Sequence, residues 1–515
     1  MTPFEQFRIW LRRAPVGERV GSSIVAGVVL ALLAFLVVPV TQSDGDEESG
    51  DIAAAATGET TTTVAGQPTA NGPEAPSADG STPGVTGSTG STGTVTGSGA
   101  RVPVAGSTAP AGCTSPPGSD QGVSGSEIKI AITITNIVGP AGNNTFGVPS
   151  VDEQELDYKL AIDALNKERG VACRKLVADF YPVNPADRNN QQGTCLDIAS
   201  TKVFAVIDAG GYYGAPSVSC YPQHQLPFLG TGRLADKQRD DGYPYLFGTG
   251  GYTDLYGNGV RALSQAGFFS EIGPLKKLGF VYRSCFDLHK MVKDLVLQAG
   301  VKESNIVEHS VGCPDGNFAN PADIQQAILK FQQNNVTHVT EAFFHSDFAN
   351  FTKVAQGQNF KPKYGILDDA IIPTTQGNLH VDYDNVEGAL IVTSDRYGDE
   401  SSGIAPNAAT QKCDAVHKAA GRPPTYQQPV GFGGVACNQI WMLAAAIDHA
   451  PALQRKSLAD GLRAAKTYDT AYPRGPVDWT APKAMFGGQF WRMQRFEKAC
   501  TCWKVSDPAF HPRFT

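Results

Sequence analysis

The sequence predicts an α/β protein with two doubly wound parallel-sheet lobes joined by a hinge, preceded by a transmembrane helix and a disordered linker. Three observations support this fold class. A run of 20 uncharged residues lies near the start of the chain, and about 80 residues of low complexity follow it. Strand and helix patterns then alternate, and the alternation restarts after about 150 residues. Strands and helices that alternate with short links favour parallel sheets covered by helices on both faces.

The apolar run, Gly21–Val40, predicts a membrane anchor. At 1.5 Å per residue a helix of this length spans roughly 30 Å, the thickness of the bilayer core. Acidic residues follow it, and four arginines precede it: Arg8, Arg12, Arg13 and Arg19. This asymmetry places residues 1–20 in the cytoplasm and the rest of the chain outside the cell membrane. A cleaved signal peptide is the alternative, but its apolar region should be shorter, with a cleavage site close behind.

Residues 41–124 are rich in Gly, Ser, Thr, Pro and Ala. A segment of this composition buries too little apolar surface to offset the entropy of ordering, so we expect a disordered linker. The folded part carries no basic run, and the chain has a net charge of −8, which argues against nucleic acid as a partner. The nine histidines form no metal-binding motif, so we expect neither a metal nor another cofactor.

The first lobe begins with a strand that has isoleucine at positions 128, 130, 132 and 134. Ser150 and Glu153 predict a capping box that starts a helix to about Arg169. Strands at 174–183 and 203–211 follow, separated by a helical stretch. The expected apolar face of the first helix consists of Leu156, Leu160, Ala164 and Leu165.

The pattern restarts with a strand at 276–285, and strands and helices alternate again to about residue 371. A strand near 387–395, three helical stretches and a β-rich tail complete the chain. We therefore expect the chain to return to both lobes. The predicted segments are 125–271 and 387–486 for the first lobe, 272–386 and 487–507 for the second lobe, and 508–515 for a tail.

Ten cysteines, all after residue 112, favour disulfides in an oxidising compartment, with scattered buried thiols as the alternative. One expected pair joins the ends of neighbouring strands in the second lobe, and the next joins consecutive helical segments of the first lobe. These pairs are Cys285–Cys313 and Cys195–Cys220. Cys500 and Cys502 are too close for easy disulfide geometry, so we expect them to pair elsewhere or with each other under strain.

Two neighbouring strands of the first lobe end in glycine, at Gly210-Gly211 and at Gly230–Gly232. Ligands of open parallel sheets lie beyond the carboxyl ends of the strands, where glycine lets the backbone approach the ligand closely. We therefore expect these turns to form one wall of a ligand cleft.

The chain from about Gly122 to Asp507 resembles the type I periplasmic binding proteins, and among them the Leu/Ile/Val-binding type that serves ABC transporters. The resemblance rests on the order and spacing of several segments. They are "IKIAITITNIVGP", "LAIDALNKERG", "KVFAVIDAGG", "LPFLGTG", "KLGFVYRSCFD", "YGILDDA" and "GPVDWTAPKA".

The resemblance implies a ligand site between the lobes. Two tyrosines replace the Ser/Thr cluster that usually grips an amino-acid carboxylate in this family, which favours a flatter or larger organic ligand. One of two adjacent aspartates is expected to hold an ammonium group, and an arginine to act as an anion clamp. The candidate residues are Gly210, Gly211, Tyr212, Tyr213, Thr231, Arg283, Phe286, Phe344, Asp368 and Asp369.

The predicted function is an extracytoplasmic receptor that delivers a small organic molecule to an ABC permease and is not an enzyme. The alternatives are a ligand-sensing domain that regulates a membrane partner and an extracytoplasmic hydrolase. The chain contains no G-x-S-x-G motif for a nucleophile. The "GFGGVA" segment at 431–436 matches a dinucleotide-binding pattern, but no apolar strand precedes it, so we interpret the match as fortuitous.

Overall fold

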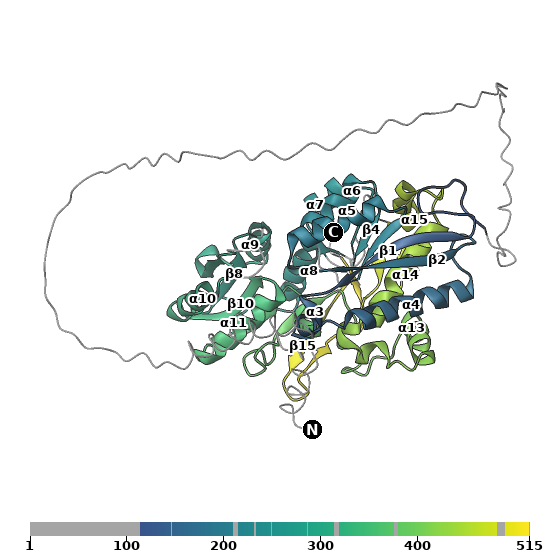
Figure 1. The fold of residues 1–515 in the computed structure, drawn as a ribbon. Helices are drawn as coiled ribbons and strands as arrows, with labels where there is room; N and C mark the ends of the chain where they lie inside the picture. Colours follow the sequence, from purple (N-terminus) through teal and green to yellow (C-terminus); the bar gives the residue numbers. More distant parts are fainter. Residues whose placement is uncertain are drawn as a thin grey trace, which may run out of the picture. The chain divides into compact units, whose positions relative to one another are not determined.

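The computed structural model describes residues 114–145, 147–209, 215–230, 233–248, 250–285, 287–313, 319–374, 380–480 and 490–513. These residues form two lobes, each built around a sheet of mainly parallel strands (Figure 1). The predicted α/β class with two doubly wound lobes is confirmed. The predicted cytoplasmic segment and membrane anchor lie outside the described residues.

The first sheet has the strand order β2-β1-β3-β4-β6, and every pair is parallel. Its strands are β1 (Glu127–Thr135), β2 (Lys175–Val183), β3 (Ala205–Asp208), β4 (Phe228–Gly230) and β6 (Leu246–Phe247). The helices of this lobe are α3 (Gly139–Thr145), α4 (Val151–Glu168), α5 (Arg188–Ser200), α6 (Ala215–Gln223), α7 (Asp236–Gly242), α13 (Ala408–Ala419), α14 (Phe432–Asp448) and α15 (Leu458–Ala465). Shorter elements are β5 (Arg233–Leu234) with β7 (Gly250–Gly251), β13 (Thr467–Tyr468) with β14 (Val477–Asp478), η2 (Thr425–Gln427), η3 (Pro429–Gly431) and η4 (Arg455–Ser457).

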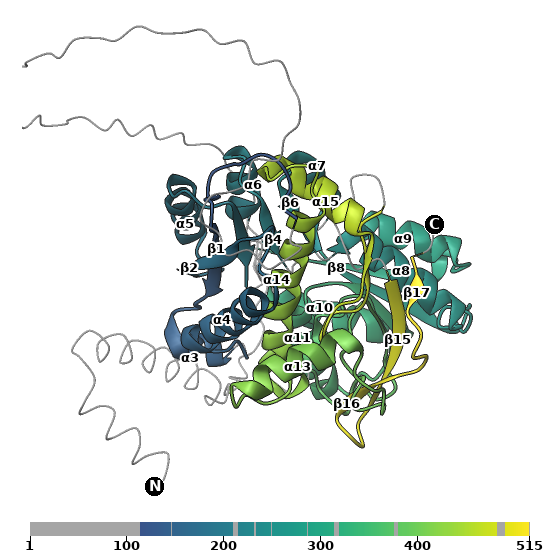
Figure 2. The same cartoon turned by 90° about the vertical axis from the view of Figure 1, so that its right-hand side faces the viewer.

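Helices cover both faces of this sheet because its central strand is apolar on both sides. The four isoleucines of β1 pack with α4 and α14 in one buried cluster. Ala131, on the opposite side of β1, packs with α5 and α6 in another. Figure 2 shows α14 beside α4.

The second sheet has the order β16-β15-β12-β11-β10-β8-β9. The strands β9, β8, β10, β11 and β12 pair in parallel in that order. Strand β15 pairs antiparallel with β12, and β16 and β17 each pair antiparallel with β15. These strands are β8 (Lys277–Arg283), β9 (Ile306–Val311), β10 (Val336–Ala342), β11 (Lys363–Ile366), β12 (Leu390–Thr393), β15 (Phe490–Glu497), β16 (Cys502–Val505) and β17 (His511–Pro512). The helices are α8 (Tyr252–Gln265), α9 (His289–Gln298), η1 (Glu303–Asn305), α10 (Pro321–Gln333), α11 (His345–Gly357) and α12 (Ile371–Thr374).

The predicted lobe boundaries at 271 and 387 are wrong. Helix α8 packs against β8 and α9, so the chain enters the second lobe before Tyr252. Strand β12 pairs with β11 and β15, so it also belongs to the second sheet. The predicted tail at 508–515 contains β17, which extends that sheet. Each of these segments belongs to the lobe whose sheet buries its apolar side chains. The order of elements along the sequence does not reveal which lobe that is.

The predicted disordered linker ends earlier than residue 124. Residues 114–124 pack on the first lobe: the Pro117 carbonyl accepts a hydrogen bond from Leu453, and the Gly122 carbonyl accepts one from Lys129. Val123 bridges to Ile128. Backbone hydrogen bonds to the lobe therefore order this polar segment despite its low apolar content.

Helix α4 begins as predicted, with the capping box between Ser150 and Glu153. Its expected apolar face is wrong, because only Leu165 of that face is buried and Leu156 is 40% exposed. The buried side instead carries Tyr158, Ile162 and the fully buried Asp157. The Asp157 carboxylate accepts hydrogen bonds from Arg422, which offset the cost of burial.

Both predicted disulfides are confirmed. Cys195–Cys220 joins α5 to α6, and Cys285–Cys313 joins the segments that follow β8 and β9. Cys413–Cys437 links α13 to α14, and Cys500 pairs with Cys502. No cysteine in the described ranges is free.

One helical stretch in the described part of the chain, Pro429–Asp448, has the length and apolar composition needed to cross a bilayer. Most of it is buried between the other elements of the first lobe. Its apolar character is therefore explained by its position in the core.

Candidate functional site

Each sheet has one place where its strand order reverses. In the first sheet this switch point lies between β1 and β3, and in the second between β8 and β10. At each switch point, the chain connections on the two sides lead to opposite faces of the sheet, so a crevice forms beyond the carboxyl ends of the strands. The described residues at these ends include Asn136 and Asp208 in the first lobe and Arg283 and Phe343 in the second. Strand topology therefore points to these two edges as the ligand site.

Hydrogen bonds connect the two edges through the segments that cross between the lobes. The Ser394 carbonyl, just after β12, accepts a hydrogen bond of 3.0 Å from Gly475. Ala471 exchanges hydrogen bonds with Asn438 of α14. The next residue, Gln439, donates to the Asp208 carbonyl at the end of β3, at 2.8 Å. A continuous path thus runs from the carboxyl edge of the second sheet to that of the first.

An ion pair and an aromatic contact hold the same crossing segments. Arg474 binds Asp395 with one guanidinium nitrogen 2.9 and 2.8 Å from the two carboxylate oxygens. The Tyr397 ring packs edge-on against Tyr472, and its hydroxyl donates to the Val430 carbonyl. We refer to residues 394–397 and 471–475 as the hinge segments.

Arg283 ends β8 at the second switch point, and its side chain is only 1% exposed. Its guanidinium lies 4.3 Å from the centre of the Phe344 ring, and its Nε lies 3.4 Å from the Asp347 carboxylate. Burial lowers the pKa of Arg283 and raises the pKa of Asp347. Asp347 and Phe344 belong to the start of α11, so the arginine connects two loops at this edge.

The sequence predicts that only one of two adjacent phenylalanines turns toward the ligand edge. Phe343 lies in the core of the second lobe, and its carbonyl accepts a hydrogen bond from Tyr256. Phe344 is half-buried against Arg283. The two rings therefore lie on opposite sides, with Phe344 on the side of the arginine.

The two candidate aspartates follow β11 and are both buried. The Asp369 carboxylate accepts hydrogen bonds from the Thr393 hydroxyl at 2.9 Å and from the Ser394 backbone at 3.1 Å. Asp368 accepts one from Ala370. Asp369 thus connects the end of β11 to the first hinge segment, a role that the sequence did not predict.

Glu341 in β10 was missed by the sequence analysis. Its carboxylate accepts hydrogen bonds from the backbone of Phe343, Leu367 and Asp368, at 2.7, 2.7 and 3.0 Å. Burial and then the nearby Asp368 carboxylate raise its pKa to about 7. A glutamate in an apolar strand is the available signal, because a charged residue is buried there only when it is bonded. It holds together the two loops that carry Phe344 and Asp369.

The candidate residues of the first wall lie outside the described residues, as does one of the second wall. They are Gly210, Gly211, Tyr212, Tyr213, Thr231 and Phe286. The strands that lead to them are described: β3 ends at Asp208 and β4 ends at Gly230. Asp208 was also missed, and its carboxylate accepts a hydrogen bond of 2.9 Å from the Thr133 hydroxyl of β1.

Two further groups of residues resemble a dinucleotide-binding motif and a metal site. The "GFGGVA" segment starts α14 after a 3-10 turn and is buried. A side chain at Gly434 would meet the Tyr472 carbonyl, so this glycine serves packing against a hinge segment. In the described part of the chain, Cys413, His417 and Cys437 lie close enough to hold a metal. The two sulfurs form a disulfide of 2.06 Å, so they are not available as thiolate ligands.

Comparisons with known proteins agree with this architecture. Residues 154–499 match the family model described as periplasmic binding protein. No curated protein matches the chain.

Solved structures share the fold at low sequence identity. An ABC transporter substrate-binding protein from Desulfitobacterium hafniense, in complex with Leu, has a TM-score of 0.52 at 16% identity, covering 74% of this chain and 99% of its own. A leucine-binding protein from Thermotoga maritima gives 0.53 at 13% identity, with 75% and 99% covered. A fatty acid ABC transporter substrate-binding protein from Thermomonospora curvata gives 0.53 at 16%, with 78% and 96% covered. Together with the family model, which spans well over half of the sequence, the two-lobed fold shows that this chain belongs to the periplasmic binding protein family.

Proposed function

We propose that the protein is an extracytoplasmic solute receptor that binds a small organic molecule between its lobes and delivers it to an ABC permease. The observation that carries this proposal is the hydrogen-bonded hinge that joins the carboxyl edges of both sheets. A ligand that contacts both edges favours the closed arrangement over the open one, which is how such a molecule reports that it is loaded. We propose binding without chemical conversion of the ligand.

The ligand class follows from the residues at the two edges. On the second lobe the half-buried Phe344 offers an aromatic surface, and the buried guanidinium of Arg283 lies 4.3 Å from the centre of its ring. For the first lobe we propose Tyr212 and Tyr213 as aromatic contacts, with Gly210, Gly211 and Thr231 as backbone and hydroxyl donors. This combination suits an amino acid, an amide or an aromatic acid. Phe286, Asp368 and Asp369 complete the proposed second wall.

We further propose that Gly21–Val40 anchors the receptor to the cell membrane, with residues 41–113 as the tether. Protease added to intact cells should then release the folded lobes and leave a short membrane-bound fragment. Secreted protein that lacks residues 1–40 would contradict this part of the proposal.

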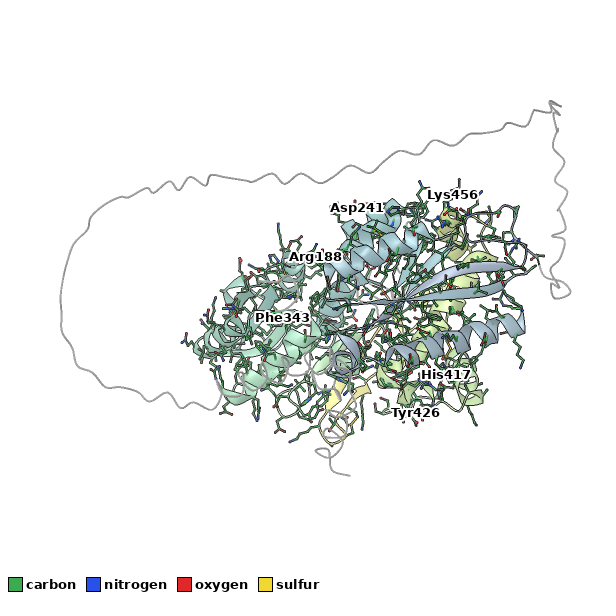
Figure 3. The ribbon with its side chains drawn as sticks, viewed as in Figure 1. Arg188, Asp241, Phe343, His417, Tyr426 and Lys456 are labelled. Carbon is green, nitrogen blue, oxygen red and sulfur yellow. A yellow bond between two sulfur atoms is a disulfide. The ribbon has the colours of Figure 1, made fainter. Side chains whose placement is uncertain are left out.

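A thermal-shift screen over amino acids, amides and aromatic acids tests the function. A ligand that binds only the folded state raises stability by RT ln(1 + [L]/Kd). Titration calorimetry should then show that Tyr212→Ala weakens binding of the hit by about 1–3 kcal/mol through lost stacking area. The matched control is Tyr426→Ala, on the first lobe near α13 (Figure 3). Equal binding by both variants would remove Tyr212 from the site, and conversion of the hit to a product would contradict the receptor.

A further inference from the structure

A second hollow lies in the first lobe at the amino ends of the strands, the edge opposite to the candidate ligand site. Its volume is about 540 Å³. The segments that line it immediately precede β4 and β6, or lie between α14 and α15 and ahead of β1. A volume of this size is in the range of sites for small organic molecules.

Three basic side chains line this hollow: His224, Arg455 and Lys456. None of the three has a carboxylate partner within ion-pair distance in the part of the chain that the structure describes. The Arg455 guanidinium instead donates to neutral oxygens, the Val203 carbonyl and the Gln121 amide. Burial lowers its pKa, as expected for a cation that lacks a full counter-charge. Lys456 is exposed at the surface of the first lobe (Figure 3).

The one acidic residue in the lining, Asp120, offsets only part of this positive charge. Both carboxylate oxygens of Asp120 accept backbone hydrogen bonds, from Gln121 at 2.7 Å and from Arg455 at 2.9 Å. The two permanent cations, Arg455 and Lys456, therefore outnumber the one carboxylate, so the hollow keeps a net positive charge that favours an anion.

The basic side chains are not explained by the helix ends nearby. Two of the last four carbonyls of α5 are occupied, because Ile198 accepts from Thr201 and Asp197 accepts from Ser200. The last carbonyls of α6 accept backbone hydrogen bonds from residues 224–226. Helix carbonyls that are already paired leave these cations free for a ligand.

The rest of the lining suits hydroxyl groups. The side chains of Ser119, Gln225 and Gln454 have no hydrogen-bond partner among the described residues, and the Tyr245 hydroxyl adds a fourth polar group. From the net positive charge and these neutral donors and acceptors together, we propose that the hollow binds a polyol phosphate, such as a sugar phosphate. This site is separate from the inter-lobe site and does not depend on the proposed receptor function.

Titration calorimetry on the full-length chain in detergent micelles tests the proposal, with glucose 6-phosphate as probe and glucose as the uncharged control. Glucose 6-phosphate should bind with saturable heat that weakens as salt is added, and glucose should not bind. Lys456→Gln should weaken binding about 2- to 5-fold, as expected for an exposed charge. Arg455→Gln should weaken it about 10-fold or more, as expected for a half-buried charged donor.

Lys302→Gln is the matched control, because Lys302 is also exposed but belongs to the second lobe. Since Arg455 also bonds the backbone, the charge reversal Lys456→Glu provides a second variant that touches no internal partner. No saturable heat up to about 10 mM probe together with no vesicle binding that depends on Lys456, or binding that is unchanged in both pocket variants, would overturn the proposal. Vesicles that contain phosphatidylinositol form a parallel arm: binding that depends on Lys456 in that arm alone would support the same chemistry with a lipid headgroup as its source.

Discussion

The two lobes bury charged side chains in different places. In the first lobe, Asp157 of α4 is fully buried and pairs with Arg422, which follows α13, so the charges join two helices. In the second lobe, Arg283 and Glu341 lie near the carboxyl ends of strands, and Asp347 lies in the first turn of α11, beside the proposed ligand loops. Burial is the main cause of the raised pKa of Asp157, to about 6, and of Glu341, to about 7.

This difference separates two uses of a buried charge. A buried ion pair adds little net stability compared with apolar side chains of the same shape, but removing one partner is costly. Between helices, such a pair fixes how the helices pack. At strand ends, it fixes the loops that contact a ligand, so we expect the second cluster to affect binding as well as folding.

The largest effect is expected from Arg283→Ala, which leaves Asp347 buried without its cation. The free energy of unfolding should fall by about 3–5 kcal/mol. Urea denaturation measures the loss, with the exposed Arg188→Ala as a control that changes stability by less than about 0.5 kcal/mol. The double variant Arg283→Met with Asp347→Leu should regain most of the stability. A loss that the double variant does not restore would show that the pair is not the cause.

Two disulfides offer a matched comparison, because they close loops of similar length. Cys195 and Cys220 are 25 residues apart, and Cys285 and Cys313 are 28 apart. In the chain-entropy model, removal of either bridge should lower stability by about 3–4 kcal/mol. Only the Cys285–Cys313 bridge follows the carboxyl ends of β8 and β9, so only its removal should also weaken ligand binding. Calorimetry on the two double-alanine variants checks this, and equal losses of affinity would contradict the assignment of that edge.

Arg422→Ala should destabilise the protein in a manner that depends on pH. The pKa of Asp157 is raised from 3.8 to about 6, so the folded state keeps a proton that the unfolded state has released between these values. The free energy of unfolding therefore falls by about 3 kcal/mol as the pH rises from about 4 to 6. Without Arg422 the carboxylate loses its attraction, so the variant should lose about 2–3 kcal/mol at pH 8 and less at pH 5. Denaturation at both pH values measures this, and a penalty that is equal at both would contradict it.

Glu341→Gln should produce the smallest change at pH 5, where both side chains are neutral, and should differ from the wild type in how stability depends on pH. The pKa of Glu341 is raised from 4.5 to about 7, so stability is lost as the pH rises between these values. Glutamine is neutral at every pH. As the pH rises from 5 to 8, the wild type should therefore lose up to about 3 kcal/mol of stability that the variant keeps. Parallel denaturation curves for the two proteins across this range would show that Glu341 does not titrate there.

Much of the fold could be predicted from residue patterns. The alternating isoleucines of β1 and the capping box of α4 predict their elements because local geometry decides them. The crossing points between lobes could not be predicted, because β12 is apolar whichever sheet it joins. The buried side of α4 was misjudged because it includes Asp157, whose partner, Arg422, is distant in the sequence.

The candidate site could be predicted only in part. Arg283 and Phe344 stand at strand ends, where the sequence places ligand contacts, and the structure brings them together. Glu341 was missed because β10 is buried on both faces, so a polar residue inside the strand does not mark an exposed side. The bond from Asp369 to Thr393 joins two strands that only the folded sheet makes neighbours.

The central claim is that the lobes close around a ligand. Spin labels at Arg188→Cys in the first lobe and Lys290→Cys in the second would measure it, because both positions are exposed at the starts of helices that follow the carboxyl edges. Double electron–electron resonance on the full-length chain, with and without the ligand found by thermal shift, gives the distance between the labels. We predict a distribution that moves to shorter distances when the ligand is added. A ligand that binds with high affinity and leaves the distribution unchanged would contradict a hinged receptor.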